Sequence, residues 1–188
     1  ISFEGNMTQV RELAATNGVG VLHPHGTLAT EPPGLIVCDV DSTVTRTEAI
    51  DLLAECAGKA DEVREVTARA MAGELDFAES LRARVKCLEG LHIGAFEEAR
   101  KATVVTPGAA ELVASAHEIG AAVGLVSGGF TALVDPLAEQ IGADFAASNE
   151  LEIVDGHLTG RVVGDIVDRA AKATWLRRWA LECGVDLE

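Results

Sequence analysis

Two aspartates, Asp39 and Asp41, stand at the end of an apolar run of strand length and are followed by a Ser-Thr pair. Side chains two residues apart on a strand point to the same face, and at its carboxyl end both project into the crevice where ligands bind. Because their charges repel each other, the pair favours a hard, oxygen-preferring cation such as Mg²⁺. The alternative is a pair of solvated or capping loop aspartates, which the preceding apolar strand makes the weaker interpretation.

A second candidate site is the sequence Ser127-Gly128-Gly129. It follows the apolar run Ala121 to Val126 and precedes a helix predicted over residues 131–141. If these residues open that helix, their N–H groups and the Ser127 hydroxyl point into the same crevice and form an anion-binding corner. An ordinary strand-to-helix turn has similar residues, so this pattern alone leaves both interpretations open.

Two charged residues lie near predicted helix starts. Lys172 falls in the first turn of a helix predicted over about residues 169–182, where the dipole disfavours a cation by about 0.3 to 1 kcal/mol. This position favours an anionic partner, with a solvated surface lysine as the alternative. Glu48 follows the predicted cap Thr47, where a carboxylate favours the helix dipole whether or not it also binds a ligand.

Arg84 differs from its charged neighbours Arg82 and Lys86. On a helix predicted over residues 77–88, it shares the apolar stripe that contains Phe77, Leu81 and Leu88. A guanidinium on a core-facing stripe requires a carboxylate or phosphate partner, because an unpaired buried charge is very costly. The alternative is a structural arginine whose head group reaches solvent.

The elements that would position these residues belong to an α/β protein. Continuous apolar runs at 35–38 and 121–126, and a weaker one at 144–147, alternate with helices predicted at 108–119 and 131–141. This alternation predicts a doubly wound parallel sheet. The long helical stretch at about 47–104 exceeds a simple crossover and is predicted to be an inserted cap. Asp155-Gly156 indicates a hairpin turn.

The two ends of the chain suggest a longer protein. Residues 1–32 are expected to be the remnant of a small α/β region, with strands at 1–3 and 19–22, a helix at 7–16 and a Pro/Gly-bounded linker, so that residues 33–188 form the main domain. A helix after the third parallel strand should lead into a fourth, yet none follows, and no initiator Met is present. We expect that the C-terminal part of the core is absent from this sequence.

Composition narrows the classes of function. A formal net charge of −15 disfavours binding to a nucleic-acid backbone. No apolar run approaches the roughly 20 residues that span a bilayer, so neither membrane nor nucleic-acid partners are expected. The four cysteines are widely spaced without a C-x-x-C pair, which predicts reduced thiols and a cytoplasmic location: Cys38, Cys56, Cys87 and Cys183.

Taken together, these motifs resemble the phosphoserine phosphatases of the haloacid-dehalogenase-like superfamily. The matching sequences are D-V-D-S-T-V from Asp39, E-L-D-F from Glu74, V-S-G-G-F from Val126, N-E-L-E-I-V-D-G from Asn149, and the lysine of R-A-A-K-A. The resemblance spans about residues 34–180. Residues 1–32 are similar to the end of the amino-acid-binding (ACT-like) regulatory region that precedes the catalytic domain in long bacterial members.

The resemblance implies a magnesium-dependent hydrolysis of O-phospho-L-serine, the last step of L-serine biosynthesis, through an aspartyl phosphate. Asp39 would be the nucleophile, Asp41 the general acid and base, and both would bind Mg²⁺, Asp39 through its carboxylate and Asp41 through its backbone carbonyl. Ser127, the Gly128 amide and Lys172 would hold the phosphoryl oxygens.

The resemblance also implies how the substrate's amino-acid part is bound. Glu48 would take the ammonium group and Arg84 the carboxylate, with Met71 and Phe77 lining the cap side. A homodimer is a further possibility. One departure is the family's G-D-G-x-x-D loop, which supplies further magnesium ligands and does not occur after Gly184. A polypeptide ending at Glu188 is therefore expected to bind magnesium weakly and to be nearly inactive.

Three alternatives remain from the sequence. The first is a phosphatase of the same type that acts on another small phosphate ester, with a different use of the cap. The second is a phospho-accepting signalling domain, although the accepting aspartate of such a domain stands alone on a later strand. The third is an incomplete, catalytically silent domain that only binds phosphate groups.

Overall fold

The computed structural model describes residues 7–18 and 26–187. The chain divides into two compact units, with the boundary between Pro33 and Gly34. The described part of the first unit contains helix α1 (Met7–Thr16), as predicted, and a short 3-10 helix, η1 (Gly26–Ala29). The strands expected at 1–3 and 19–22 lie outside the described residues, as does the start of the predicted linker.

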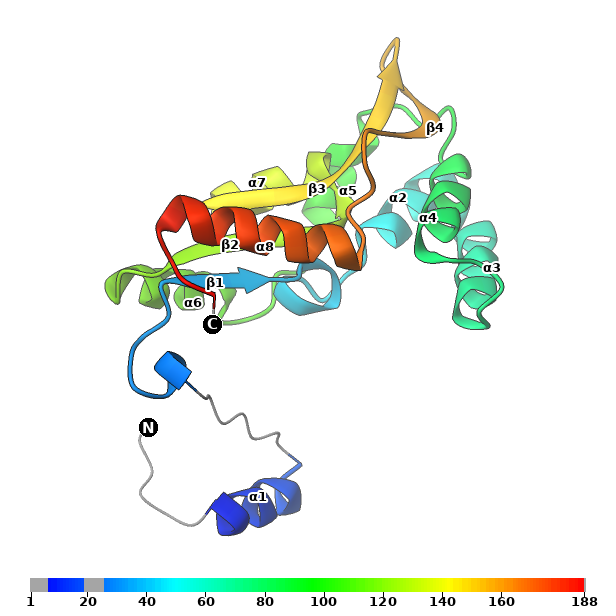
Figure 1. Ribbon diagram of the computed structural model, residues 1–188. Helices are drawn as coiled ribbons and strands as arrows, with labels where there is room; N and C mark the ends of the chain where they lie inside the picture. Colours follow the sequence, from blue (N-terminus) through cyan, green and yellow to red (C-terminus); the bar gives the residue numbers. More distant parts are fainter. Residues whose placement is uncertain (1–6, 19–25, 188) are drawn as a thin grey trace. The chain divides into compact units, whose positions relative to one another are not determined.

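A four-stranded sheet forms the centre of the second unit (Figure 1). Strands β1 (Leu35–Cys38), β2 (Ala122–Phe130) and β3 (Phe145–Val154) are parallel, and β4 (His157–Val163) is antiparallel to β3. The predicted hairpin is confirmed: Asp155 and Gly156 both have positive φ, 49° and 76°, as a type I′ turn requires. β2 runs four residues further than the predicted strand, with a register shift between Val126 and Phe130.

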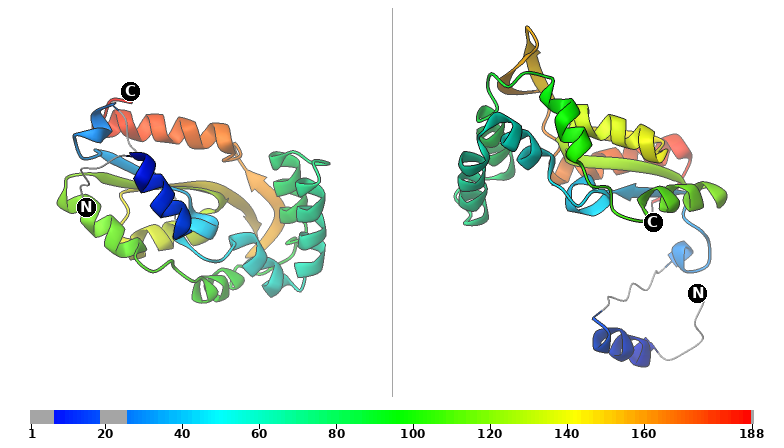
Figure 2. Two further views of the ribbon diagram at one scale, coloured as in Figure 1. Left: turned by 90° about the horizontal axis from the view of Figure 1, so that it is seen from below. Right: turned by 180° about the vertical axis from the view of Figure 1, so that it is seen from behind.

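Helices cover both faces of the sheet (Figures 1 and 2). On one face, Val123 and Leu125 of β2 pack with α6 (Ala109–Glu118) and α7 (Thr131–Ile141). On the other, Val126 packs with Trp179 of α8 (Arg169–Cys183). This alternation along one strand confirms the doubly wound α/β prediction, since each face has its own apolar layer.

The predicted helical cap lies between β1 and α6. After a tight turn, η2 (Val40–Val44), it consists of α2 (Ala49–Ala57), α3 (Ala60–Met71), α4 (Phe77–Lys86) and α5 (Ala95–Ala102). Its apolar core includes Leu53, Leu81 and Leu88, and it also contains Leu151 and Leu158 from the β3–β4 hairpin. The cap is therefore completed by a segment far from it in the sequence.

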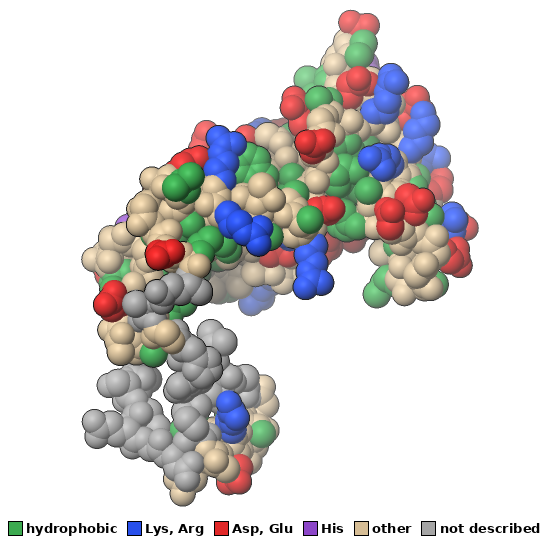
Figure 3. All heavy atoms as spheres, in the orientation of Figure 1, with side chains coloured by type: hydrophobic (Ala, Val, Ile, Leu, Met, Phe, Trp, Pro, Cys, Tyr) green, Lys and Arg blue, Asp and Glu red, His purple; other side chains and the backbone are tan. Residues whose placement is uncertain are grey.

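Surface composition agrees with the acidic sequence. On the face shown in Figure 3, Lys and Arg side chains of the second unit stand among Asp and Glu side chains. All four cysteines are free. Within the described ranges, no helix combines the length and apolar character needed to cross a membrane.

Candidate active site

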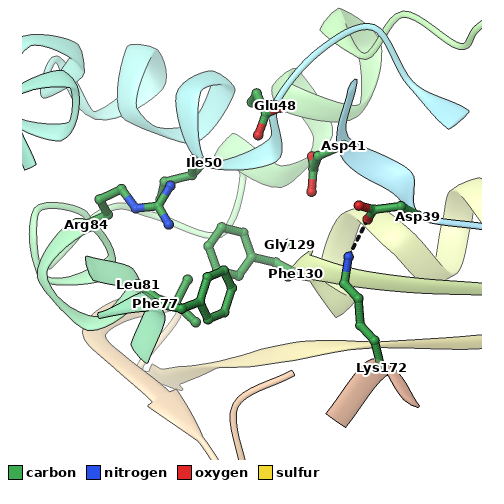
Figure 4. Close-up of a pocket in the computed structure, with 11 residues that line it drawn as sticks. Asp39, Asp41, Glu48, Ile50, Phe77, Leu81, Arg84, Gly129, Phe130 and Lys172 are labelled. Carbon is green, nitrogen blue, oxygen red and sulfur yellow. Dashed lines mark ion pairs between the residues drawn. The ribbon is translucent and has the colours of Figure 1, made fainter. Parts of the chain in front are cut away.

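Asp39 directly follows β1 and forms an ion pair with Lys172 of α8 (Figure 4). Its Oδ1 lies 2.7 Å from Nζ of Lys172 and accepts a hydrogen bond of 2.8 Å from the Val40 N–H. Both contacts involve the same oxygen, so among the described residues Oδ2 remains available to a ligand. Asp39 is half-exposed, at 48%, and a ligand can therefore reach it.

Asp41 is held more firmly than Asp39. Its Oδ1 accepts a 2.8 Å hydrogen bond from the N–H of Ala49, the first residue of α2, and its Oδ2 accepts one of 3.0 Å from the Ser127 hydroxyl. Burial raises the pKa of Asp41 above its ordinary value, and the nearby charges of Glu48 and Asp39 add to this effect, against the two hydrogen bonds. A carboxyl group with a raised pKa suits a residue that must carry and release a proton.

The Ser127-Gly128-Gly129 segment differs from its expected role as a helix start. It continues β2, and α7 begins only at Thr131. Ser127 is fully buried and lies behind the pocket wall, where its hydroxyl donates to Asp41 and accepts from the Gly129 N–H at 2.8 Å. The prediction of a helix N-terminus here was wrong because the chain remains extended until Phe130.

The two glycines of this segment allow close approach of other side chains. A Cβ at Gly129 would lie 2.7 Å from Oδ2 of Asp41, and one at Gly128 would lie 2.9 Å from the Phe77 ring. Any larger residue would therefore displace the carboxylate or the ring. These close contacts explain why both positions are glycine, without the need for a positive φ.

Asn149 connects this segment to the helix that carries Lys172. It is 1% exposed; its Nδ2 donates to the Gly128 carbonyl at 2.9 Å, and its Oδ1 accepts from the Val167 N–H at 2.8 Å. Val167 directly precedes Asp168, which caps α8 through the Ala171 N–H. No role was assigned to Asn149 from the sequence, because its place on the buried face of β3, between Ala147 and Leu151, becomes evident only in the structure.

Glu48 stands at the start of α2, as predicted, and faces the pocket (Figure 4). Its Oε1 accepts a 2.5 Å hydrogen bond from the hydroxyl of Ser42. Ser42 has a left-handed backbone, with φ 56°, which is uncommon for a residue other than glycine. The tight turn after β1 thus orients Glu48 as well as Asp41.

Arg84 is half-buried, whereas its neighbours Arg82 and Lys86 are exposed, which agrees with the predicted difference between them. Burial lowers the pKa of Arg84 from its ordinary value, and the charges of Asp51 and Glu48 oppose this shift. Among the described residues no carboxylate forms an ion pair with it; its Nε donates to the Ser80 carbonyl at 3.4 Å. A half-buried guanidinium without an ion-pair partner can bind an anionic ligand.

These side chains line one pocket of about 250 Å³ (Figure 4). All predicted site residues except Ser127 and Met71 line it, including Asp39, Asp41, Glu48, Arg84, Gly128 and Lys172. Three apolar residues that were not predicted also line it: Ile50, Leu81 and Phe130. Phe77 lines it as expected. Met71 does not, because it lies at the end of α3 and is 86% exposed. The expectation for Met71 is therefore not met in this structure.

The pocket has two chemically distinct ends. Asp39 and Lys172 form one end, Glu48 and Arg84 flank the other, and the Phe77 and Phe130 rings lie between Arg84 and the strand that carries Gly129 (Figure 4). Oxygen donors at Asp39 and Asp41 suit Mg²⁺, but no group of three His, Cys, Asp or Glu in the described part of the chain could hold a metal ion. The arrangement can bind a phosphoryl group at one end and a zwitterion at the other.

Comparisons with known proteins identify the family of the chain. The family model for haloacid dehalogenase-like hydrolases matches residues 36–188. A phosphoserine phosphatase of Streptomyces coelicolor is 52% identical over 93% of this chain and 42% of its own length. Another, of Streptococcus thermophilus, is 49% identical over 84% of this chain and 73% of its own length. The chain thus spans less than half of the first of these relatives.

Solved structures show the same fold. One described as a phospho-aspartyl intermediate analogue of phosphoserine phosphatase has a TM-score of 0.77 at 39% identity and covers 84% of this chain and 75% of its own. A HAD-family hydrolase of Salmonella enterica has a TM-score of 0.85 at 25% identity, over 95% of this chain and 61% of its own. The chain belongs to the haloacid dehalogenase-like hydrolases.

Proposed function

We propose that this protein hydrolyses O-phospho-L-serine to L-serine and phosphate through a phosphoryl group carried on Asp39. The observation that carries the proposal is the division of the pocket: a carboxylate with a free oxygen and Lys172 2.7 Å away at one end, and Glu48 with Arg84 at the other. Glu48 matches an ammonium group and Arg84 a carboxylate. The names of the relatives in Streptomyces and Streptococcus support the same substrate.

In the first half-reaction, Oδ2 of Asp39 attacks phosphorus while the bond from phosphorus to the serine oxygen breaks. Lys172 offsets the negative charge that gathers on the phosphoryl oxygens, and its contact with Oδ1 of Asp39 keeps the nucleophile oriented. Asp41 in its protonated form gives its proton to the leaving serine oxygen. The raised pKa of Asp41 favours that form.

In the second half-reaction, a water molecule attacks the phosphorus of the aspartyl phosphate and restores the Asp39 carboxylate. Asp41, now ionised, takes a proton from that water, so one residue serves both steps. Ser127 and Ala49 hold the Asp41 carboxylate during this exchange. Ser127 is therefore proposed to act through Asp41, and not by the phosphoryl contact expected from the sequence, because it is fully buried and does not line the pocket.

Mg²⁺ is the proposed cofactor. The Asp39 carboxylate and the Asp41 backbone carbonyl would hold it, with hard oxygen donors of the kind that this ion prefers. When bound, the ion would supply positive charge at the phosphoryl group.

The free state of all four cysteines supports the proposal of a reducing, cytoplasmic location.

The amino-acid end of the site is tested by Arg84→Ala with a panel of phosphate esters. For phosphoserine, kcat/KM should fall about 10- to 100-fold, because a hydrogen bond to a charged group is worth roughly 1.5 to 3 kcal/mol. Esters without a carboxylate, such as p-nitrophenyl phosphate, should react at the parent rate. Arg82→Ala, on the exposed side of the same helix, is the matched control. Phosphoserine activity that survives Arg84→Ala would contradict the amino-acid assignment.

A further inference from the structure

The β3–β4 hairpin reaches from the core sheet to the cap helix that carries Arg84. The first half of β3 pairs with β2, as far as Asn149 opposite Phe130, and the second half pairs with β4. One continuous strand therefore belongs to the sheet that bears the phosphoryl end of the site and to the hairpin. Beyond the sheet, the hairpin lies beside α4 in two views (Figures 1 and 2).

The hairpin is joined to the segment after α4 by backbone hydrogen bonds. The Gly90 N–H donates to the Leu158 carbonyl at 2.8 Å, and the Leu158 N–H donates to the Leu91 carbonyl at 2.9 Å. A third bond, of 3.0 Å, runs from the Ile93 N–H to the Gly156 carbonyl. These bonds attach the segment that follows α4 to the hairpin, next to an isolated antiparallel bridge between His92 and His157.

Apolar packing fixes the helix against the same hairpin. Val85 of α4 and Leu88, two residues after the helix, are fully buried in a cluster that includes Leu151 and Leu158. On its other side α4 contacts α3, whose only fully buried residue among those described is Val63. The hairpin is thus one of two supports of α4, and the one that connects it to the core sheet.

At Gly160 the hairpin closely approaches the C-terminal end of α4. Gly160 has φ 75°, and a Cβ there would lie 3.0 Å from Cβ of Glu89 and 3.3 Å from Cα of Lys86. Lys86 is two residues beyond Arg84 on the same helix, so a side chain at position 160 would push against the backbone that positions the guanidinium. Gly164 has a similar φ, 71°, with nothing within 4 Å of its Cβ position.

We propose that the hairpin contributes to substrate specificity. Gly160 acts as a positioning residue that sets the distance between Arg84 and Asp39. The inference rests on the proposed role of Arg84 as the carboxylate-binding residue. On this inference, the hairpin selects phosphate esters by length. Esters whose carboxylate lies at the correct distance from phosphorus are bound at both ends of the pocket. The phosphoryl chemistry itself does not depend on Gly160.

The test compares Gly160→Ala with Gly164→Ala, which introduces similar backbone strain without the contact. Gly160→Ala should raise KM for phosphoserine about 2- to 5-fold, because contacts of 3.0 and 3.3 Å require the neighbouring backbone to move by a few tenths of an ångström and a displacement of about 1 Å can cost up to 10²-fold. For p-nitrophenyl phosphate, both variants should keep the parent KM. In an Arg84→Ala background, Gly160→Ala should add no further effect, as expected for two residues that act as one unit.

Val162→Ala, which reduces packing at the same junction without strain, should give a smaller shift in the same direction and serves if Gly160→Ala folds poorly. Equal shifts for Gly160→Ala and Gly164→Ala, or an undiminished effect in the Arg84→Ala background, would overturn the inference.

Failure of the proposed function would appear separately, as a parent protein without preference for phosphoserine over p-nitrophenyl phosphate. In that case, amide hydrogen exchange still tests whether Gly160 fixes α4 against the hairpin. The amides of Gly90 and Leu158 should exchange faster in Gly160→Ala than in Gly164→Ala. Equal exchange in the two variants would show that Gly160 does not fix α4.

Discussion

Arg84 and Asn149 show what a single residue does and does not reveal before its surroundings are known. Arg84 could be predicted because a charge on an apolar helical stripe conflicts with its local pattern. Asn149 fits a strand without conflict, and its role depends on Gly128 and Val167, which it contacts only after folding. Met71 was assigned to the pocket by analogy, and its 86% exposure shows that position in a motif does not fix position in space.

Asn149→Ala tests this residue-scale account. The substitution removes the partners of the Gly128 carbonyl and of the buried Val167 N–H, at a cost of about 1 to 3 kcal/mol each, so the free energy of unfolding should fall by about 2 to 6 kcal/mol. Because Asn149 joins the Gly128 segment to the start of α8, kcat for phosphoserine should fall more than KM rises. Urea denaturation and steady-state kinetics check the two effects. Glu150→Ala, next to it on β3 and exposed, should change neither, and equal behaviour of the two variants would contradict the assignment.

At the scale of elements, strands and helices were predictable wherever local pattern and tertiary packing agree. The predicted helices at 131–141 and 169–182 are found as α7 (Thr131–Ile141) and α8 (Arg169–Cys183). The end of β2 was mispredicted, because Ser-Gly-Gly resembles a turn while Ser127 is held in the extended chain by Asp41 from another element. The carboxyl ends of the strands still deliver the site, as the topology requires.

Asp144 offers a pH-dependent test of how two elements are joined. Although partial burial raises its pKa, hydrogen bonds from the Val123 N–H, at 2.7 Å, and from His117 lower it below the ordinary value overall. A lowered pKa means that the stabilisation is present above the unfolded-state pKa, about 3.9, and is lost as pH falls through the folded-state value.

Asp144→Asn should therefore reduce the free energy of unfolding near pH 7 by about 0.5 to 1.5 kcal/mol, and the difference from the parent should shrink towards pH 3. Urea titrations at several pH values measure it. Asp155→Asn, at the exposed hairpin turn, is the control without this pair. A difference for Asp144→Asn that stays constant from pH 7 to pH 3 would contradict the explanation.

At the scale of the whole molecule, the site is assembled from segments that are distant in the sequence. Asp39 and Asp41 come from the end of β1 and the turn after it, Arg84 from the cap, and Lys172 from α8. The sequence predicted both the core and the cap but not their connection through the β3–β4 hairpin, because no local pattern indicates that Leu158 completes the core of α4. That connection links the phosphoryl end of the pocket to the end proposed to recognise the amino acid.

The central claim is that Asp39 carries the phosphoryl group, and chemical trapping tests it most directly. The protein is mixed with O-phospho-L-serine labelled in its phosphoryl group and with Mg²⁺, quenched in acid within the first turnover and digested, and the labelled peptide is identified. We expect a hydroxylamine-labile label on Asp39 that is absent in Asp39→Asn and forms at least as fast as phosphate is released at steady state. Phosphate release with the label on another residue, or with no label on the protein at any quench time, would contradict the account.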